Sequence, residues 1–224
     1  TRNLQHVNQP DSRGIVPVIH PSPHSSNKGS CIIMSYEIEA RKIFLFGIPK
    51  TGKSTFASKM KGVYFISTEA GLDFLKVKNK RIKTWEEFKK FLTYLETNIE
   101  TMKSTKCFVV DTVDRLNTLC YSHVMKSLNI DSPREKNFGK DWKALRLEWE
   151  SNINRLMMLD KGVLFIGHAK EIEVEVETEL IKSTMAGYAS SMPGNAKEYI
   201  LSSVDFAWCA DQITITTKDS KGKK

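Results

Sequence analysis

Residues 47–55 of this 224-residue chain read GIPKTGKST, and they directly follow the apolar run Lys42–Phe46. The string matches the pattern G-x-x-x-x-G-K-[ST] in full. Glycines in such a loop let backbone N–H groups turn inward, and the helix that follows adds the positive end of its dipole. The string therefore predicts a cradle for the phosphates of a nucleotide. The alternative is a glycine-rich turn with a solvated lysine.

The pattern also gives roles to individual side chains. Lys53 is expected to reach the β- and γ-phosphates, and the Ser54 hydroxyl is expected to ligate Mg²⁺. ATP and Mg²⁺ are thus the predicted cofactors. The expected nucleotide-binding residues are Gly47, Pro49, Lys50, Thr51, Gly52, Lys53, Ser54 and Thr55.

A carboxylate ends a second apolar run, Cys107–Asp111. Taken alone, an aspartate after an apolar strand is more often a helix N-cap. Next to a phosphate loop, Asp111 is expected to hold the Mg²⁺, acting through water. The next residue is Thr112 and not the glutamate that many P-loop ATPases use to activate water, so a hydrolytic base must come from elsewhere.

The rest of the chain alternates short apolar runs with longer segments of helical period, which predicts an α/β fold with a mostly parallel sheet and flanking helices. Thr84 and Glu87 form a capping box ahead of a helix whose apolar face extends to Ile99. Alternation over 171–179 and 212–217 predicts antiparallel strands at the C-terminal end. The expected parallel strands are 42–46, 63–67, 106–111 and 163–167.

Glu69 lies just beyond the second of these strands, at the rim where open α/β sheets bind ligands. His168 follows the fourth strand in the same way. Without further information, Glu69 can equally be a glutamate that favours a helix dipole, and His168 a structural histidine.

Four segments in combination resemble the phage nucleotide-binding branch of RecA-like P-loop ATPases, which includes single-strand annealing proteins. They are PKTGKST at 49–55, STEAGL at 67–72, VDTVD at 110–114 and GHAK at 167–170, and the resemblance covers roughly residues 40–210. It implies a RecA-like fold, ATP hydrolysis with Glu69 as base, and single-stranded DNA as partner. His168 stands where RecA-type enzymes usually place a glutamine that senses the γ-phosphate, so the sequence departs from the family pattern at this position.

The segment 193–199, PGNAKEY, resembles a RecA segment that lies near the nucleotide of a neighbouring subunit. The resemblance implies a homo-oligomer in which Lys197 acts in trans. A short turn with a surface lysine explains the same residues, and Lys170 is the rival candidate for the trans role.

The net charge of +8 is unevenly distributed. Residues 1–33 carry +2 and four of the seven prolines, which is typical of a disordered leader, and residues 218–224 form a basic tail of +3. The core is therefore expected at 34–217. Within it, residues 76–90 carry +5, a cluster that suits either phosphate binding or a solubilising connection.

Several classes of function are disfavoured. No apolar run approaches the roughly 20 residues of a membrane span, and no signal peptide is recognisable, so a cytoplasmic protein is expected. The four cysteines are far apart and contain no C-x-x-C pair, which argues against a metal knuckle or disulfide framework. The absence of N-K-x-D disfavours a GTPase. The remaining alternatives to an ATPase in phage recombination, annealing or replication are a small-molecule P-loop kinase and a nucleotide-gated assembly module with incidental hydrolysis.

Overall fold

The computed structural model describes residues 41–72, 74–137, 139–177 and 182–211. The strands are β1 (Lys42–Gly47), β2 (Val63–Ser67), β3 (Lys78–Arg81), β4 (Cys107–Asp111), β5 (Gly162–Glu177), β6 (Lys182–Ser190) and β7 (Phe206–Ala210). The helices are α1 (Lys53–Ser58), α2 (Trp85–Thr97), α3 (Ile99–Ser104), α4 (Val113–Ser127), the 3-10 helix η2 (Glu135–Asn137), α5 (Lys140–Met157) and α6 (Gly194–Ser203). The expected leader 1–33, strand 212–217 and tail 218–224 lie outside the described residues.

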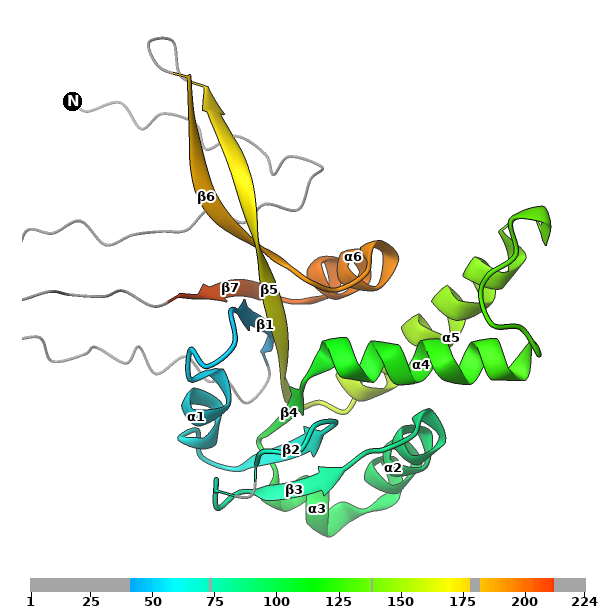
Figure 1. Ribbon diagram of the computed structural model, residues 1–224. Helices are drawn as coiled ribbons and strands as arrows, with labels where there is room; N and C mark the ends of the chain where they lie inside the picture. The colour runs from blue at the N-terminus through cyan, green and yellow to red at the C-terminus, as the bar shows by residue number, and fades with distance from the viewer. Residues whose placement is uncertain (1–40, 73, 138, 178–181, 212–224) are drawn as a thin grey trace, which may run out of the picture.

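Strands in the order β3-β2-β4-β5-β1-β7 form a parallel sheet, and β6 pairs antiparallel with β5 (Figure 1). This arrangement confirms the predicted fold class, a mostly parallel sheet with flanking helices and antiparallel pairing towards the C-terminal end. β5 lies between β1 and β4, so the strand that precedes the phosphate loop and the strand that ends at Asp111 are not direct neighbours.

Alternating side chains of the sheet belong to two apolar cores, one on each face. Phe44, Phe108 and Phe165 pack with α2, α4, α5 and α6, whereas Ile43 and Leu164 pack on the other face with α1. Each of these five side chains is at most 2% exposed. Because strands buried on both faces are apolar at every position, β1 and β4 read as continuous apolar runs in the sequence.

β5 is longer than expected. The predicted strand 163–167 and residues 171–177 of the predicted strand 171–179 are parts of one 16-residue strand, and residues 178 and 179 lie outside the described part. Ala169–Glu177 leaves the parallel sheet and pairs with β6. Figure 1 shows this β5–β6 hairpin projecting from the body of the protein. The sequence pattern changes at this point because the first half of β5 is buried between two layers, whereas Glu171 and Glu173 are exposed.

The predicted cap of α2 is confirmed, and its predicted end is wrong. The Thr84 hydroxyl accepts a hydrogen bond from the Glu87 N–H at 3.2 Å. The helix ends at Thr97, because the Asn98 side chain caps α3 by accepting from the Thr101 N–H at 2.8 Å. Ile99, expected on the buried face, is consequently 68% exposed.

Candidate nucleotide site

The loop between β1 and α1 depends on two glycines. A Cβ atom at Gly47 would overlap with the carbonyl oxygen of Ala210, so only glycine lets β7 pair so closely with the end of β1. Gly52 has a φ of 82° at the N-cap of α1. This left-handed conformation is unfavourable for any residue that has a side chain, and glycine adopts it freely. The loop's own conformation therefore requires glycine at position 52, whereas the close approach of β7 requires it at position 47.

The Lys53 side chain folds over the loop and contacts its backbone. Its Nζ donates hydrogen bonds to the carbonyl oxygens of Gly47 and Ile48, both at 2.8 Å, and contacts the Thr51 hydroxyl at 3.3 Å. The residue is 7% exposed. Burial lowers the pKa of Lys53, and the negative charge of Asp111 opposes that shift. The ammonium group is therefore held inside the loop that is expected to bind phosphates.

The other residues of the motif lie around it. Thr51 and Ser54 are half-buried. The Thr51 hydroxyl donates a hydrogen bond to the Ile48 carbonyl at 3.0 Å. Pro49, Lys50 and Thr55 are exposed.

Asp111 ends β4 beside the loop and is 8% exposed. The Ser54 hydroxyl donates a hydrogen bond to its carboxylate. Burial raises the pKa of Asp111, and the nearby charge of Glu69 adds to this, while Ser54 and Lys53 act in the opposite direction. The site therefore holds a carboxylate whose charge is costly unless a cation is close to it.

The strand order brings the four strand ends together. Gly47 at the end of β1 is in register with His168 on β5, Asp111 is in register with Ile166 on β5, and Ser67 at the end of β2 is in register with Asp111. Since the strands are parallel, the residues that follow them lie along one edge of the sheet. This edge is where open α/β sheets bind ligands.

Glu69 and His168 meet at this edge. The Thr112 hydroxyl donates a hydrogen bond to Glu69 Oε1 at 2.7 Å, and His168 Nε2 lies 3.6 Å from the same oxygen. Both side chains reach solvent, at 36% exposure for His168 and 46% for Glu69. The pair is open to a ligand bound at the loop.

Asp114, in the first turn of α4, fixes the backbone at His168. Asp114 Oδ2 accepts a hydrogen bond from the His168 backbone N–H at 2.9 Å, and Oδ1 accepts one from the Ser191 hydroxyl at 2.6 Å. The Ser191 N–H in turn donates to the His168 carbonyl at 2.9 Å. No sequence pattern indicates the link between Asp114 and Ser191, because the two residues are 77 positions apart.

A second polar link joins the ends of β2 and β4. The Thr68 hydroxyl donates to the Thr112 carbonyl and accepts from the Thr112 N–H, both at 2.9 Å. The Asp111–Thr112 peptide bond is cis. The contact was not predicted, although a polar residue directly after each of two strands, Thr68 after β2 and Thr112 after β4, is a sequence signal for it.

The two lysines expected near a neighbouring subunit lie outside this cluster. Lys170 is exposed on β5, two residues beyond His168, where the strand leaves the parallel sheet. Lys197 is half-buried on α6. The alternative interpretation of its segment as a short turn is wrong, because residues from Gly194 onward form a ten-residue helix.

Among the described residues, no group of three or more His, Cys, Asp or Glu side chains is arranged to hold a metal ion. The oxygen atoms of Ser54 and Asp111 nevertheless fit Mg²⁺, which binds hard oxygen ligands and is usually held by one or two carboxylates together with substrate phosphates. No helix of the described part is long and apolar enough to cross a bilayer.

A parallel α/β sheet with a phosphate loop after its first strand defines a P-loop nucleotide-binding protein. A family model described as an AAA domain matches residues 39–222, and the chain therefore belongs to this family of P-loop ATPases. It is also 28% identical over 142 residues to an SPbeta prophage-derived uncharacterized protein of Bacillus subtilis strain 168. That match covers 62% of the chain and 44% of the relative, so the chain corresponds to less than half of that protein.

Proposed function

We propose that the protein is a Mg²⁺-dependent ATPase that acts on single-stranded DNA in phage recombination, annealing or replication, in the cytoplasm of the host. The observation that carries the hydrolytic part is the contact between Glu69, Thr112 and His168, on the same sheet edge as the phosphate loop. The RecA-like resemblance of the four sequence segments supports the DNA partner.

Each group at the edge has one task in this proposal. Lys53 binds the β- and γ-phosphates, and Ser54 and Asp111 hold Mg²⁺, which neutralises phosphate charge when bound. Glu69 accepts a proton from the attacking water, with its carboxylate oriented by the Thr112 hydroxyl at 2.7 Å. His168 contacts the γ-phosphate, and its backbone position is fixed by Asp114.

The decisive experiment measures ATP hydrolysis with and without single-stranded DNA across a salt series. Stimulation that weakens as salt rises supports the proposal, since phosphate contacts release counterions. Turnover unaffected by single strands would instead favour the assembly module, and phosphate transferred to a small acceptor would favour the kinase.

The base is tested by Glu69→Gln, with Glu171→Gln on β5 as the matched control. Glu69→Gln should bind ATP normally and lose at least roughly 100-fold in turnover, because an amide cannot accept the proton. Glu171 is exposed beyond the edge, so its variant should keep full turnover. Equal rates in the two variants would exclude Glu69 as the base.

A homo-oligomer with Lys197 or Lys170 acting in trans stays a prediction. Its test mixes subunits: Lys53→Ala subunits bind no nucleotide yet still carry both lysines, and they should restore hydrolysis to Lys197→Ala subunits. If only Lys170→Ala subunits are rescued, the trans residue is Lys170. No rescue of either variant would exclude action in trans.

A further inference from the structure

A cavity of about 400 Å³ lies away from the phosphate loop, between α4, α5 and the start of α6. Its volume falls in the range of roughly 300–1,000 Å³ that is typical of small-molecule sites. Asn117 and Tyr121 of α4, Trp142 and Trp149 of α5, and residues 193–196 are among its walls. We call this cavity the α5 pocket.

Its aromatic walls differ in how firmly they are held. Trp149 is 1% exposed and stacks on Trp85 of α2, with ring centroids 5.9 Å apart at 24°. Trp142 is 51% exposed and takes part in no ring pair of the described residues. An exposed indole at the rim of a cavity offers a free face for stacking, which is how proteins bind the bases of single strands.

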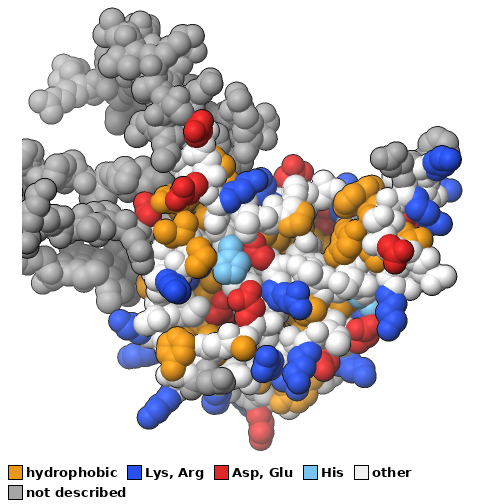
Figure 2. All heavy atoms as spheres, in the orientation of Figure 1, with side chains coloured by type: hydrophobic (Ala, Val, Ile, Leu, Met, Phe, Trp, Pro, Cys, Tyr) orange, Lys and Arg blue, Asp and Glu red, His pale blue; other side chains and the backbone are white. Residues whose placement is uncertain are grey.

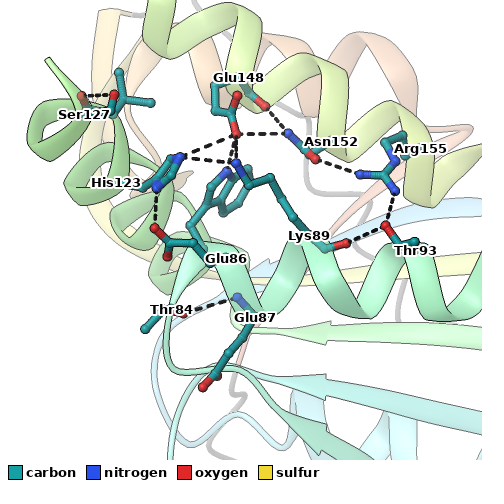
Figure 3. Close-up of polar contacts among 12 residues, drawn as sticks. Thr84, Glu86, Glu87, Lys89, Thr93, His123, Ser127, Glu148, Asn152 and Arg155 are labelled. Carbon is teal, nitrogen blue, oxygen red and sulfur yellow. Dashed lines mark hydrogen bonds and ion pairs between the residues drawn. The ribbon is translucent and has the colours of Figure 1, made fainter.

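Helices α2, α4 and α5, on which these walls rest, are joined by polar contacts (Figure 3). Glu148 Oε1 of α5 accepts hydrogen bonds from Trp85 Nε1 at 2.7 Å and from Lys89 Nζ at 3.0 Å, both on α2. His123 of α4 contacts Glu86 of α2 at 2.7 Å. These contacts order the helices around the pocket before any ligand binds, so binding loses little conformational entropy.

Polar groups in the walls bear on the chemistry of the ligand. Trp149 Nε1 is buried and has no hydrogen-bond partner. The Asn117 side chain is 6% exposed. The Asn117 amide in the pocket wall is both a donor and an acceptor of hydrogen bonds. A nucleobase carries ring nitrogens, carbonyl oxygens and N–H groups that can match such an amide, whereas an apolar side chain from another protein cannot.

The surface beside the pocket is basic. Residues 134–147 contain five Lys or Arg against two acidic residues, and one of these acids, Asp141, is bound by Arg134 through hydrogen bonds of 3.0–3.2 Å. Lys140, Lys143 and Arg146 are exposed on the same helix as Trp142, and Arg146 also pairs with Glu150 at 3.5 Å. Figure 2 shows Lys and Arg side chains next to apolar ones on the side of the molecule formed by α4 and α5. This charge suits a phosphate backbone and opposes a basic peptide.

We propose that the α5 pocket binds a nucleobase of a single-stranded nucleic acid, with Trp142 stacking on the base while the α5 cations contact adjacent phosphates. The proposal rests on the proposed function and places one of its DNA contacts. Two residues of the pocket wall lie close in sequence to residues that contact each other at the nucleotide site. Asn117 lies one helical turn after Asp114, and Pro193 lies two residues after Ser191. The Ser191 hydroxyl donates a hydrogen bond to Asp114, so the pocket and the nucleotide site share these two segments.

The test measures the affinity of a fluorescent thymidine oligonucleotide by anisotropy for wild type, Trp142→Ala, Trp142→Phe and Trp208→Ala. Trp208 on β7 is 38% exposed and lines no part of the pocket, so its variant is the matched control. Trp142→Ala should bind roughly tenfold more weakly, Trp142→Phe should recover most of the loss because it keeps a ring, and Trp208→Ala should match wild type.

An oligonucleotide of equal length that lacks its bases separates stacking from phosphate contact. Wild type should bind the strand without bases more weakly than the thymidine strand. Trp142→Ala and wild type should bind the strand without bases with equal affinity. Equal affinities of wild type and Trp142→Ala for the thymidine strand would overturn the pocket while leaving the proposed function in place. Wild type that binds no single strand would overturn both. Competition by free thymidine monophosphate at the same nucleotide concentration would overturn the assignment to a strand.

Discussion

Asp114→Ala removes a carboxylate that joins three segments of the chain. In wild type, Asp114 of α4 accepts from the His168 N–H at the end of the parallel part of β5 and from the Ser191 hydroxyl just before α6. Alanine leaves both donors without their acceptor. We therefore expect the substitution to weaken the attachment of the β5–β6 hairpin and α6 to the nucleotide edge.

The size of the effect follows from the two hydrogen bonds. Bonds to a charged group contribute about 1.5–3 kcal/mol each, and the lower end applies because both are partly open to solvent. The Ser191 bond is the more exposed of the two, so Ser191→Ala should cost about 1 kcal/mol and Asp114→Ala about 2–3 kcal/mol. Asp114→Asn should fall between them, because the amide keeps a single acceptor oxygen.

The assay is urea unfolding followed by circular dichroism, with the free energy of unfolding extrapolated to water. Asp131→Ala, which removes an exposed carboxylate elsewhere, is the control and should change stability by less than about 0.5 kcal/mol. A double variant of Asp114 and Ser191 should cost less than the sum of the two singles, since they share a bond. Additive costs, or an Asp114→Ala cost equal to that of the control, would refute this account.

Three further substitutions test the site and its surroundings. Lys53→Ala should abolish ATP binding, measured by titration calorimetry, with an unchanged circular dichroism spectrum. Asp111→Asn should abolish Mg²⁺-dependent turnover but raise the free energy of unfolding at pH 7. Burial raises the pKa of Asp111 in the folded protein, so ionisation of its carboxyl group destabilises the fold as pH rises. The extra stability of the Asn variant should therefore vanish at acidic pH, where the carboxyl group is protonated. Asp141→Asn should have the opposite pH dependence, because Arg134 lowers the pKa of Asp141 to about 2, and the stability this contributes near neutral pH is lost as pH falls towards 2.

The fold class and the phosphate loop could be predicted because both are local in the sequence. Alternating apolar runs and helical periods indicate a parallel sheet, and the left-handed conformation of Gly52 belongs to the motif itself. The contact with Ala210 that requires glycine at position 47 is not local. The order of the strands is not local. That β5 lies between β1 and β4, and so brings His168 to the edge beside Asp111, depends on which strand pairs with which.

The long-range polar contacts could not be predicted for the same reason. Thr68 and Thr112 are 44 positions apart, and Asp114 and Ser191 are 77 apart. Helical spacing also fails to distinguish Trp142 from Trp149, because residues seven positions apart on a helix lie on the same face. The structure buries only Trp149, because α2 contributes Trp85 at that level of the helix.

The position of Asp114 gives the two candidate sites a thermodynamic relation that can be measured. If a single strand in the α5 pocket strengthens ATP binding by some factor, ATP must strengthen binding of the strand by the same factor. The contacts that link the sites pass through the first turn of α4 and Ser191, so Asp114→Asn should bring that factor towards one while each ligand still binds alone. Measuring strand affinity with and without a non-hydrolysed ATP analogue tests this. A factor that is above one in wild type and unchanged in Asp114→Asn would mean that the coupling runs through another part of the fold.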